Sequence, residues 1–203
     1  MNFLNSTRFC GIIGADREGL HYEEHEGKNK KIFMLFIVNF SLKILMITLR
    51  PMTTAEFPQY RDYFIVDYAT EIAANYGYSL EKSQAIAAQE LMDDLPQDVS
   101  TPEHTLLCIE RSGTETIGYL WYKRLDQGQT VFILDFVLFE KFRGLGHGQA
   151  ALLALEEQLL ETGLEQIKLR VAFDNKRALR LYEKLGFTIT GYNMVKILEN
   201  RNL

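Results

Sequence analysis

The sequence contains very little cysteine, with only Cys10 and Cys108 among its 203 residues. Such sparse use excludes a disulfide framework and is typical of a reducing compartment, so we expect a cytoplasmic protein. Cys108 stands in the apolar stretch TLLCIE, where a small buried hydrophobic residue is expected. No base is implied beside it, so the sequence does not favour a cysteine nucleophile.

An excess of positive charge is also missing. The 22 Lys and Arg residues are outnumbered by 27 Asp and Glu residues, which gives a formal net charge of −5. The sequence therefore offers no basic footprint for nucleic acid, and its acidic balance favours a cationic or amine partner. It has no internal repeat, no low-complexity tract and no metal-ligand motif, so we predict no metal site. At 47% hydrophobic content, the chain can bury one sizeable core.

The first part of the chain, residues 1–45, differs from the rest and is predicted to be an extension. Residues 1–31 lack sustained periodicity and are typical of a loop or a disordered arm. Residues 32–49, IFMLFIVNFSLKILMITL, raise the question of a membrane anchor, but Asn39 and Lys43 interrupt them. Two interpretations are preferred. MITLRPMT is a first strand that ends at Pro51, and Met46 is a natural start that makes the preceding segment an upstream addition.

From Met46 onward the chain is predicted to form one domain, residues 46–203, of mixed helices and strands. Helical spacing of apolar residues predicts helices over 55–77, 79–95, 147–163 and 175–186. Strands are predicted on both sides of the turn Ser112-Gly113, over 130–140, over 165–173 and in FTITGYNMVKIL, residues 187–198. The three strands between 104 and 140 should form an antiparallel meander.

A basic, glycine-rich elbow follows the most apolar strand. VFILDFVLFE is apolar at nearly every position, as in a central strand covered on both faces, and Asp135 is its exception. RGLGHG then leads into a helix. A P-loop would need a lysine that is absent here, and a dinucleotide fingerprint would need a third glycine where Gln149 stands. The remaining pattern, RxxGxG at a helix start, is suited to holding a phosphate through backbone N–H groups.

A second motif, NKRALRLYEKLGF, lies thirty residues further on and places Asn175 and Tyr182 two helical turns apart. Together with RGLGHG in this order and spacing, it resembles the GNAT superfamily of acetyl-CoA-dependent N-acetyltransferases. The resemblance implies an α/β fold with a mixed sheet of six or seven strands and about four flanking helices. It also implies a cofactor cleft between the strands around Val137 and Val171.

The resemblance implies a set of sites for acetyl-CoA, the expected co-substrate. The backbone of Phe136, Val137 and Leu138 would bind the pantetheine arm, and Asn175 would contact the pantetheine or phosphate region. The pyrophosphate would be held by the elbow and helix start. These residues are Arg143, Gly144, Leu145, Gly146, His147, Gly148 and Gln149. For His147, a helix-cap or solvent-facing role is preferred over catalysis.

The chemistry of amide formation suggests two catalytic residues. An amine that attacks a thioester needs an acid for the departing thiolate, and a phenol with a pKa of about 10 can protonate a thiol whose pKa is about 8.5. Tyr182 is therefore the predicted acid, although a Tyr on an amphipathic helix also suits a core position. Asp135 is the best candidate for the base, directly or through water, because burial raises the pKa of a carboxyl group. A structural or substrate-binding role for Asp135 stays open.

The expected partner is a primary amine on a small molecule or a peptide, and both a monomer and a homodimer are compatible with the sequence. The acceptor surface should come from the first two helices, their joining loop ANYGYS, Trp121 and Tyr122. The alternative is a GNAT-like module that binds CoA without turnover and serves as a sensor or scaffold.

Overall fold

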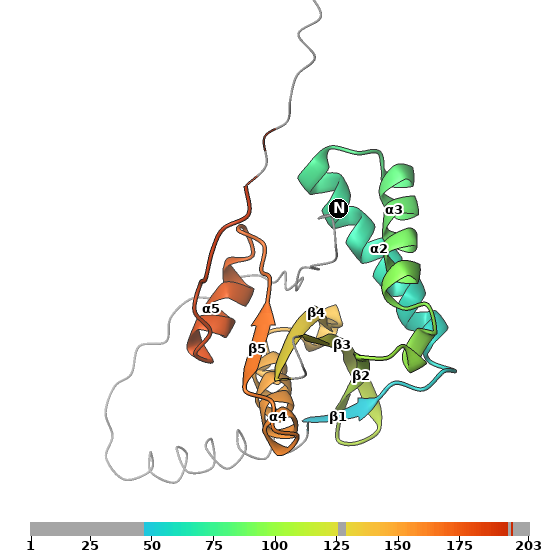
Figure 1. Cartoon of the computed structure of the whole chain (residues 1–203). Helices are drawn as coiled ribbons and strands as arrows, with labels where there is room; N and C mark the ends of the chain where they lie inside the picture. The colour runs from blue at the N-terminus through green and yellow to red at the C-terminus, as the bar shows by residue number, and fades with distance from the viewer. Residues whose placement is uncertain (1–46, 126–128, 195, 197–203) are drawn as a thin grey trace, which may run out of the picture.

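The computed structural model describes residues 47–125, 129–194 and 196 (Figure 1). The predicted extension, residues 1–45, lies outside the described residues, as does the apolar segment before residue 47. The strand predicted to end at Pro51 is confirmed as β1 (Ile47–Pro51). No helix within the described ranges is both long and apolar enough to span a bilayer.

A mixed sheet forms the centre of the described structure. After β1 come β2 (His104–Arg111), β3 (Glu115–Leu125), β4 (Thr130–Leu138) and β5 (Gln166–Leu169). The spatial order is β1-β2-β3-β4-β5, with antiparallel pairs up to β4 and a parallel pair between β4 and β5. The predicted meander is confirmed as β2, β3 and β4.

The prediction of six or seven strands is wrong, because the described residues form five strands. The missing strand is the one expected in residues 187–198, of which 187–194 are described and adopt no strand. Alternating apolar residues form a strand only when a neighbouring strand pairs with them. Here Ile189, Tyr192 and Met194 are exposed, and only Phe187 packs against the core.

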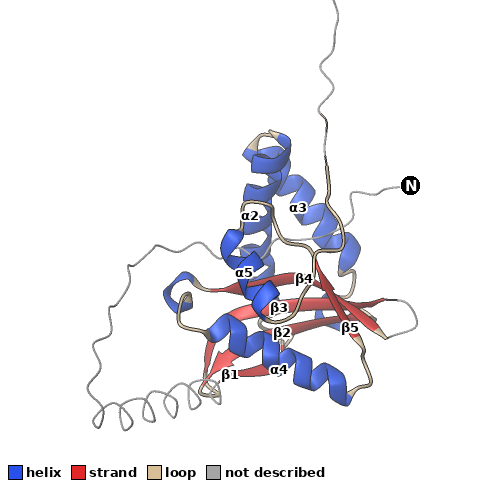
Figure 2. Ribbon diagram, turned by 90° about the vertical axis from the view of Figure 1, so that its left-hand side faces the viewer, coloured by secondary structure: helices blue, strands red, loops and turns tan. Residues whose placement is uncertain are grey.

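Within the described residues, four α-helices cover the sheet, as predicted, and they pack on its two faces (Figures 1 and 2). On one face lie α2 (Phe57–Tyr76) and α3 (Leu80–Asp94), whose apolar residues join a core with β2, β3 and β4. On the other lie α4 (His147–Glu161) and α5 (Lys176–Lys184). The turn between α2 and α3 uses Gly77 in the left-handed conformation, and Ser79 caps α3 by accepting from Lys82 N–H.

A bulge in β4 changes the direction of its side chains. Trp121 of β3 pairs with Asp135 and Tyr122 pairs with Ile133, so Leu134 is the additional residue on β4. Before the bulge Ile133 faces the α4 core, and after it Phe136 and Leu138 do so. Leu134 and Asp135 therefore both lie toward α2, which a strict alternation of faces would not allow.

A close approach of β3 and β4 depends on Gly118. A Cβ atom at this position would stand 2.1 Å from the carbonyl oxygen of Val137. Since real Cβ atoms do not come this close to backbone, any side chain at Gly118 would push β3 away from the end of β4. The glycine thus keeps the last residues of β4 in place.

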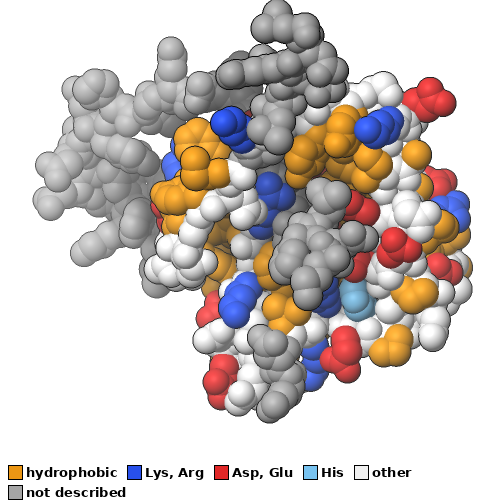
Figure 3. Space-filling view, turned by 45° about the horizontal axis from the view of Figure 1, so that its top comes forward, with side chains coloured by type: hydrophobic (Ala, Val, Ile, Leu, Met, Phe, Trp, Pro, Cys, Tyr) orange, Lys and Arg blue, Asp and Glu red, His pale blue; other side chains and the backbone are white. Residues whose placement is uncertain are grey.

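Charge is distributed unevenly among the helices. On α2 and α3 the acidic residues outnumber the basic ones, whereas α5 is basic. The acidic residues of α2 and α3 are Asp62, Asp67, Glu71, Glu81, Glu90, Asp93 and Asp94, and the basic residues of α5 are Lys176, Arg177, Arg180 and Lys184. Most acidic side chains visible in Figure 3 lie in the right half of the view, the side on which Figure 1 shows α2 and α3.

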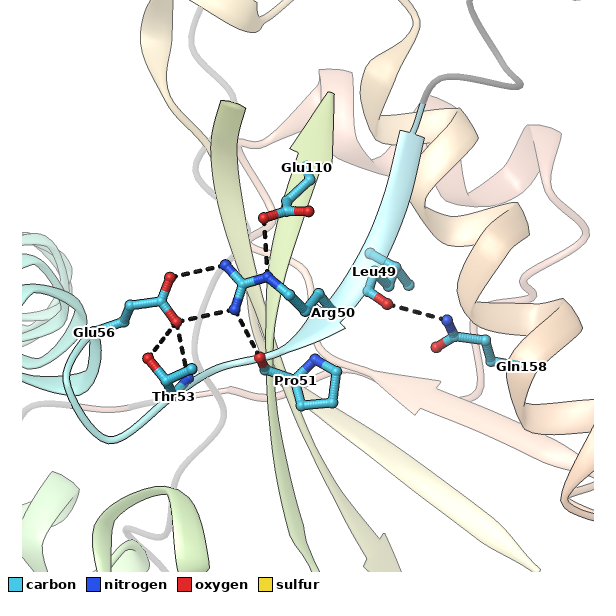
Figure 4. A network of polar contacts seen from close by, with 7 residues as sticks. All are labelled: Leu49, Arg50, Pro51, Thr53, Glu56, Glu110 and Gln158. Atoms are coloured by element: carbon cyan, nitrogen blue, oxygen red, sulfur yellow. Dashed lines mark hydrogen bonds and ion pairs between the residues drawn. The ribbon is translucent and has the colours of Figure 1, made fainter. Parts of the chain in front are cut away.

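An ionic network joins the end of β1 to the start of α2 (Figure 4). The Arg50 guanidinium donates to both carboxylate oxygens of Glu56, at 2.8 and 3.0 Å, and its Nε donates to Glu110 at 2.9 Å. Glu56 also accepts from the N–H and the hydroxyl of Thr53. The hydrogen bonds from Arg50, which have the largest effect, and those from Thr53 lower the pKa of Glu56 from 4.5 to about 2.

Cys108 lies beside Arg50. Burial raises the pKa of its thiol to about 11, in agreement with a buried, unreactive cysteine.

We expect the Glu56→Gln variant to lose about 1 kcal/mol of unfolding free energy at pH 7, a figure kept small because both partners are partly exposed. The folded pKa lies below the unfolded one, so the carboxylate stabilises the fold above about pH 4.5 and this contribution is lost as the pH falls toward 2. Urea unfolding measured between pH 7 and pH 3 should show that the unfolding free energies of the parent and of Glu56→Gln approach each other as the pH falls. Glu157→Gln, on the exposed face of α4, is the control; a constant difference for Glu56→Gln at all pH values would contradict this account.

Candidate active site

The elbow after β4 forms an open helix N-terminus. A 3-10 turn, η3 (Glu140–Phe142), leads from β4 into it, and Gly144 and Gly146 adopt φ values of 81° and 84°. Gly146 is the N-cap of α4, which has no side-chain cap hydrogen bond. Because the first N–H groups of a helix have no acceptor within it, and the helix dipole makes this end positive, the elbow is suited to a bound anion.

Two side chains of the elbow fold back onto the backbone before it. Arg143 Nε donates to the carbonyl of Leu138 at 2.7 Å. His147 is buried, with its Nδ1 3.2 Å from the carbonyl oxygen of Phe142, to which a protonated Nδ1 donates. The solvent-facing alternative for His147 is therefore wrong. Both contacts tie the elbow to the preceding turn and strand end.

The parallel strands β4 and β5 part near the middle of β4. Their ladder joins Thr130–Ile133 to Gln166–Leu169, and β4 then continues to Leu138 while β5 ends at Leu169. Val171, which was expected to face Val137 across the opening, lies beyond the end of β5. The two strands separate after Ile133, so Phe136, Val137 and Leu138 of β4 lie beyond the ladder with β5, as predicted. This part of β4 leads toward the elbow.

The second motif lies on α5. Asn175 is its N-cap, and its side-chain oxygen accepts from the N–H of Ala178 at 3.0 Å. Tyr182 follows two turns later, is 3% exposed, and packs edge-to-face against Phe187 with ring centroids 5.5 Å apart. Gly148 at the start of α4 lies close to this helix, since a Cβ atom there would stand 3.4 Å from Leu181. The two sequence motifs therefore lie side by side in the structure.

Asp135 is 1% exposed and its carboxylate accepts a hydrogen bond from the hydroxyl of Tyr60 at 3.1 Å. Tyr60 comes from the first turns of α2 and is itself fully buried. Tyr60 lies on the apolar face of the helix that was predicted over 55–77, and the sequence indicated no further role for it. A tyrosine on that face was the one available signal, because a buried phenol normally requires a hydrogen-bond partner.

The expected aromatic acceptor surface is only partly present. Trp121 is 1% exposed and donates to His104 Nδ1 at 3.0 Å, so it belongs to the core rather than to a substrate surface. Its large apolar area is buried between the sheet and Phe64 of α2. Tyr122 faces the other side of the sheet, with the α4 core.

A polar pair not anticipated from the sequence joins α2 to α3. The Tyr68 hydroxyl donates to Glu90 at 2.6 Å. Burial, opposed by this hydrogen bond, raises the pKa of Glu90, and burial together with the bond to Glu90 raises the pKa of Tyr68. The two residues lie 22 positions apart, so no local pattern could have indicated their contact.

Comparison with known proteins identifies the family. The model of the Acetyltransferase (GNAT) family matches residues 65–187. The chain belongs to the GNAT acetyltransferase family. This range includes β4, the elbow, α4 and α5, so the family match covers both motifs from which the resemblance was drawn.

Two proteins of Bacillus subtilis (strain 168) match most of the chain. YycN, named an uncharacterized N-acetyltransferase, is 34% identical over 156 residues, which cover 76% of this chain and 100% of YycN. YdgE, named in the same way, is 30% identical over 76% of this chain and 99% of YdgE. The crystal structure of YycN superimposes with a TM-score of 0.70 over 75% of this chain and 99% of YycN. The GNAT fold and the acetyltransferase family are thus shown together.

A more distant structure shares the fold alone. Spermidine N-acetyltransferase from Vibrio cholerae, solved in complex with CoA and spermine, is 18% identical with a TM-score of 0.55, over 76% of this chain and 88% of that protein. At this level of identity the similarity describes the arrangement of helices and strands.

Proposed function

We propose that the protein transfers the acetyl group of acetyl-CoA to a primary amine of a small molecule or a peptide. The observation that carries this proposal is the parting of β4 from β5 beside the elbow, where α4 begins without a side-chain cap. An extended strand end that leads into a positive helix terminus can hold a chain of amides followed by phosphates. Pantetheine diphosphate has this form.

The cofactor contacts are proposed along this path. Phe136, Val137 and Leu138 would bind the pantetheine arm, Arg143 to Gln149 would hold the diphosphate, and Asn175 would contact the arm from α5. The presence of CoA in the distant Vibrio cholerae structure supports a CoA ligand for this fold. The family match also supports acetyl-CoA as the co-substrate.

The proposed reaction forms an amide bond and breaks the thioester bond. The neutral amine attacks the carbonyl carbon, the C–S bond breaks, and Tyr182 donates its proton to the departing sulfur. Asp135 receives the proton that the amine loses. Since Asp135 and Tyr60 are both buried and hydrogen-bonded, we propose that this proton passes through the Tyr60 hydroxyl to the carboxylate. The products are an acetamide and CoA with a free thiol.

The acidic character of α2 and α3 supports a cationic amine as the acceptor. Charged helices of one sign raise the local concentration of ligands of opposite sign. The basic residues on α5, beside the elbow, suit the anionic cofactor in the same way. A cytoplasmic location is proposed from the sparse cysteine, since a reducing compartment holds the acetyl-CoA that the reaction needs.

Two measurements on the same preparation test the proposed function. Acetyl-CoA should raise the melting temperature, because a ligand that binds only the folded state stabilises it, and a panel of diamines, amino acids and peptides should identify amines that release free CoA thiol. Stabilisation without thiol release by any amine would favour the sensor or scaffold module instead. Absence of stabilisation at millimolar acetyl-CoA would overturn the proposal.

A further inference from the structure

A row of three aromatic side chains, Tyr60, Phe64 and Trp121, lies between α2 and the sheet beside the proposed base. The ring centroids of Tyr60 and Phe64 lie 5.9 Å apart, and those of Phe64 and Trp121 lie 5.6 Å apart. At one end of this aromatic row, the Tyr60 hydroxyl donates to Asp135 at 3.1 Å. At the other end, Trp121 is the residue of β3 directly opposite Asp135, so the two side chains are neighbours on one face of the sheet. Both ends of the aromatic row therefore reach Asp135.

The orientation of Trp121 is fixed by His104, the first residue of β2. The indole N–H donates to His104 Nδ1 at 3.0 Å, and the two rings lie 5.6 Å apart. An indole nitrogen can only donate, so His104 Nδ1 is unprotonated and the imidazole carries its proton on Nε2. A doubly protonated imidazole offers no acceptor. Protonation of His104 therefore breaks this bond and leaves the buried indole N–H without its partner, a state that costs free energy.

The surroundings of His104 keep it neutral near pH 7.5. Burial has the largest effect and lowers the pKa of His104 from its usual 6.5, and the charge of Lys123, opposite it on β3, acts in the same direction. The charges of Asp94, at the end of α3, and of Glu103 oppose this change. The 3-10 turn η1 (Asp98–Ser100), which precedes β2, carries one further acid. Because burial outweighs the acids, His104 binds a second proton only in mildly acidic solution.

We propose that His104 is a positioning residue for the proposed base, and that its protonation lowers turnover in mildly acidic solution. This inference rests on the proposed function. Neutral His104 holds the indole of Trp121, which packs edge-to-face on Phe64. Phe64 in turn packs on the ring of Tyr60, whose hydroxyl is thereby kept on the carboxylate of Asp135. Loss of the indole bond misaligns the two groups that are to receive the proton of the amine, and small displacements of catalytic groups are costly in rate.

Tryptophan fluorescence tests the contact without any substrate, because Trp121 is the only tryptophan in the sequence. Between pH 8 and pH 5 the emission of the parent should change, with a midpoint below pH 6.5. His104→Asn offers an amide oxygen near the position of Nδ1 and does not titrate in this range, so its emission should stay constant. His104→Leu has no acceptor and should resemble the acidic form of the parent at every pH. Constant emission of the parent, or an equal change in His104→Asn, would overturn the inference.

The rate of thiol release tests the effect on the reaction. The ratio of the parent's kcat to that of His104→Asn cancels the titration of the amine and of Asp135, which both proteins share. This ratio should be constant above pH 7.5 and fall at least roughly threefold by pH 5, with acetyl-CoA affinities that stay equal. At pH 7.5, His104→Leu should turn over roughly tenfold more slowly than the parent and bind acetyl-CoA equally well.

Two outcomes separate failure of the inference from failure of the proposed function. A kcat ratio that stays constant down to pH 5, in proteins that release thiol, would overturn the positioning role of His104 while leaving acetyl transfer intact. If no amine releases thiol from the parent or from His104→Asn, the proposed function fails and the positioning role fails with it. The asparagine variant keeps a hydrogen bond to the indole, so the comparison does not depend on whether His104→Leu folds.

Discussion

The Tyr182→Phe variant should fold, bind acetyl-CoA as the parent does, and turn over roughly 10²–10⁴-fold more slowly. The ring packs in the core against Phe187, and phenylalanine keeps that packing while removing the hydroxyl proposed to protonate the departing sulfur. A loss of this size corresponds to about 3–5 kcal/mol of barrier, the range of general acid catalysis. Because water can also protonate a thiolate, the lower part of the range is expected. Single-turnover rates of thiol release, at saturating acetyl-CoA, would measure the effect.

The affinity for acetyl-CoA distinguishes a role in the transition state from a role in binding. A fall in rate without a comparable fall in affinity places the phenol in the transition state. Tyr192→Phe removes a hydroxyl from a residue that is 78% exposed and should behave as the parent. If Tyr182→Phe turns over at the parent rate when chemistry limits the reaction, the residue is structural and another group donates the proton.

The second large effect is expected at the elbow. A Gly146→Val chain should lose roughly 100-fold in acetyl-CoA affinity, because a branched side chain at the N-cap of α4 obstructs the approach of phosphate to the backbone N–H groups. Valine also disfavours the observed φ of 84°, which lowers stability by about 1–3 kcal/mol. Calorimetry with acetyl-CoA and thermal unfolding without it would measure the two effects separately.

Gly163 provides a matched control for the backbone strain. It follows the other end of α4, has a φ of 77°, and a Cβ atom there would meet nothing within 4 Å. Gly163→Val should therefore show a similar loss of stability and an unchanged affinity for acetyl-CoA. Equal affinities for Gly146→Val and the parent would remove the elbow from the cofactor site.

The local patterns of the sequence predicted most of the fold correctly. The apolar run of β4, the helical spacing of α2 and α4 and the glycines that follow α2, α4 and α5 each depend on residues within one or two turns of one another. The elbow could be recognised for the same reason, because Arg143, Gly144 and Gly146 lie in a single short segment and the two glycines act through backbone geometry. The failure of the last predicted strand follows from the opposite condition, since a strand at 187–194 would need a partner that is not specified by its own sequence.

What the sequence determined by itself is the order of elements, the position of the anion-binding elbow and the motif pair of the GNAT family. Only the tertiary structure decided that Asp135 meets Tyr60, 75 positions away, and that α5 lies beside the elbow and the first turn of α4, where Lys184 donates to Gln149. The first contact requires the bulge that turns Asp135 toward α2. The second requires α4 and α5 to pack on the same face of the sheet. Periodicity specifies which face of an element is apolar, whereas the neighbour of each polar side chain is set by how separate elements pack together.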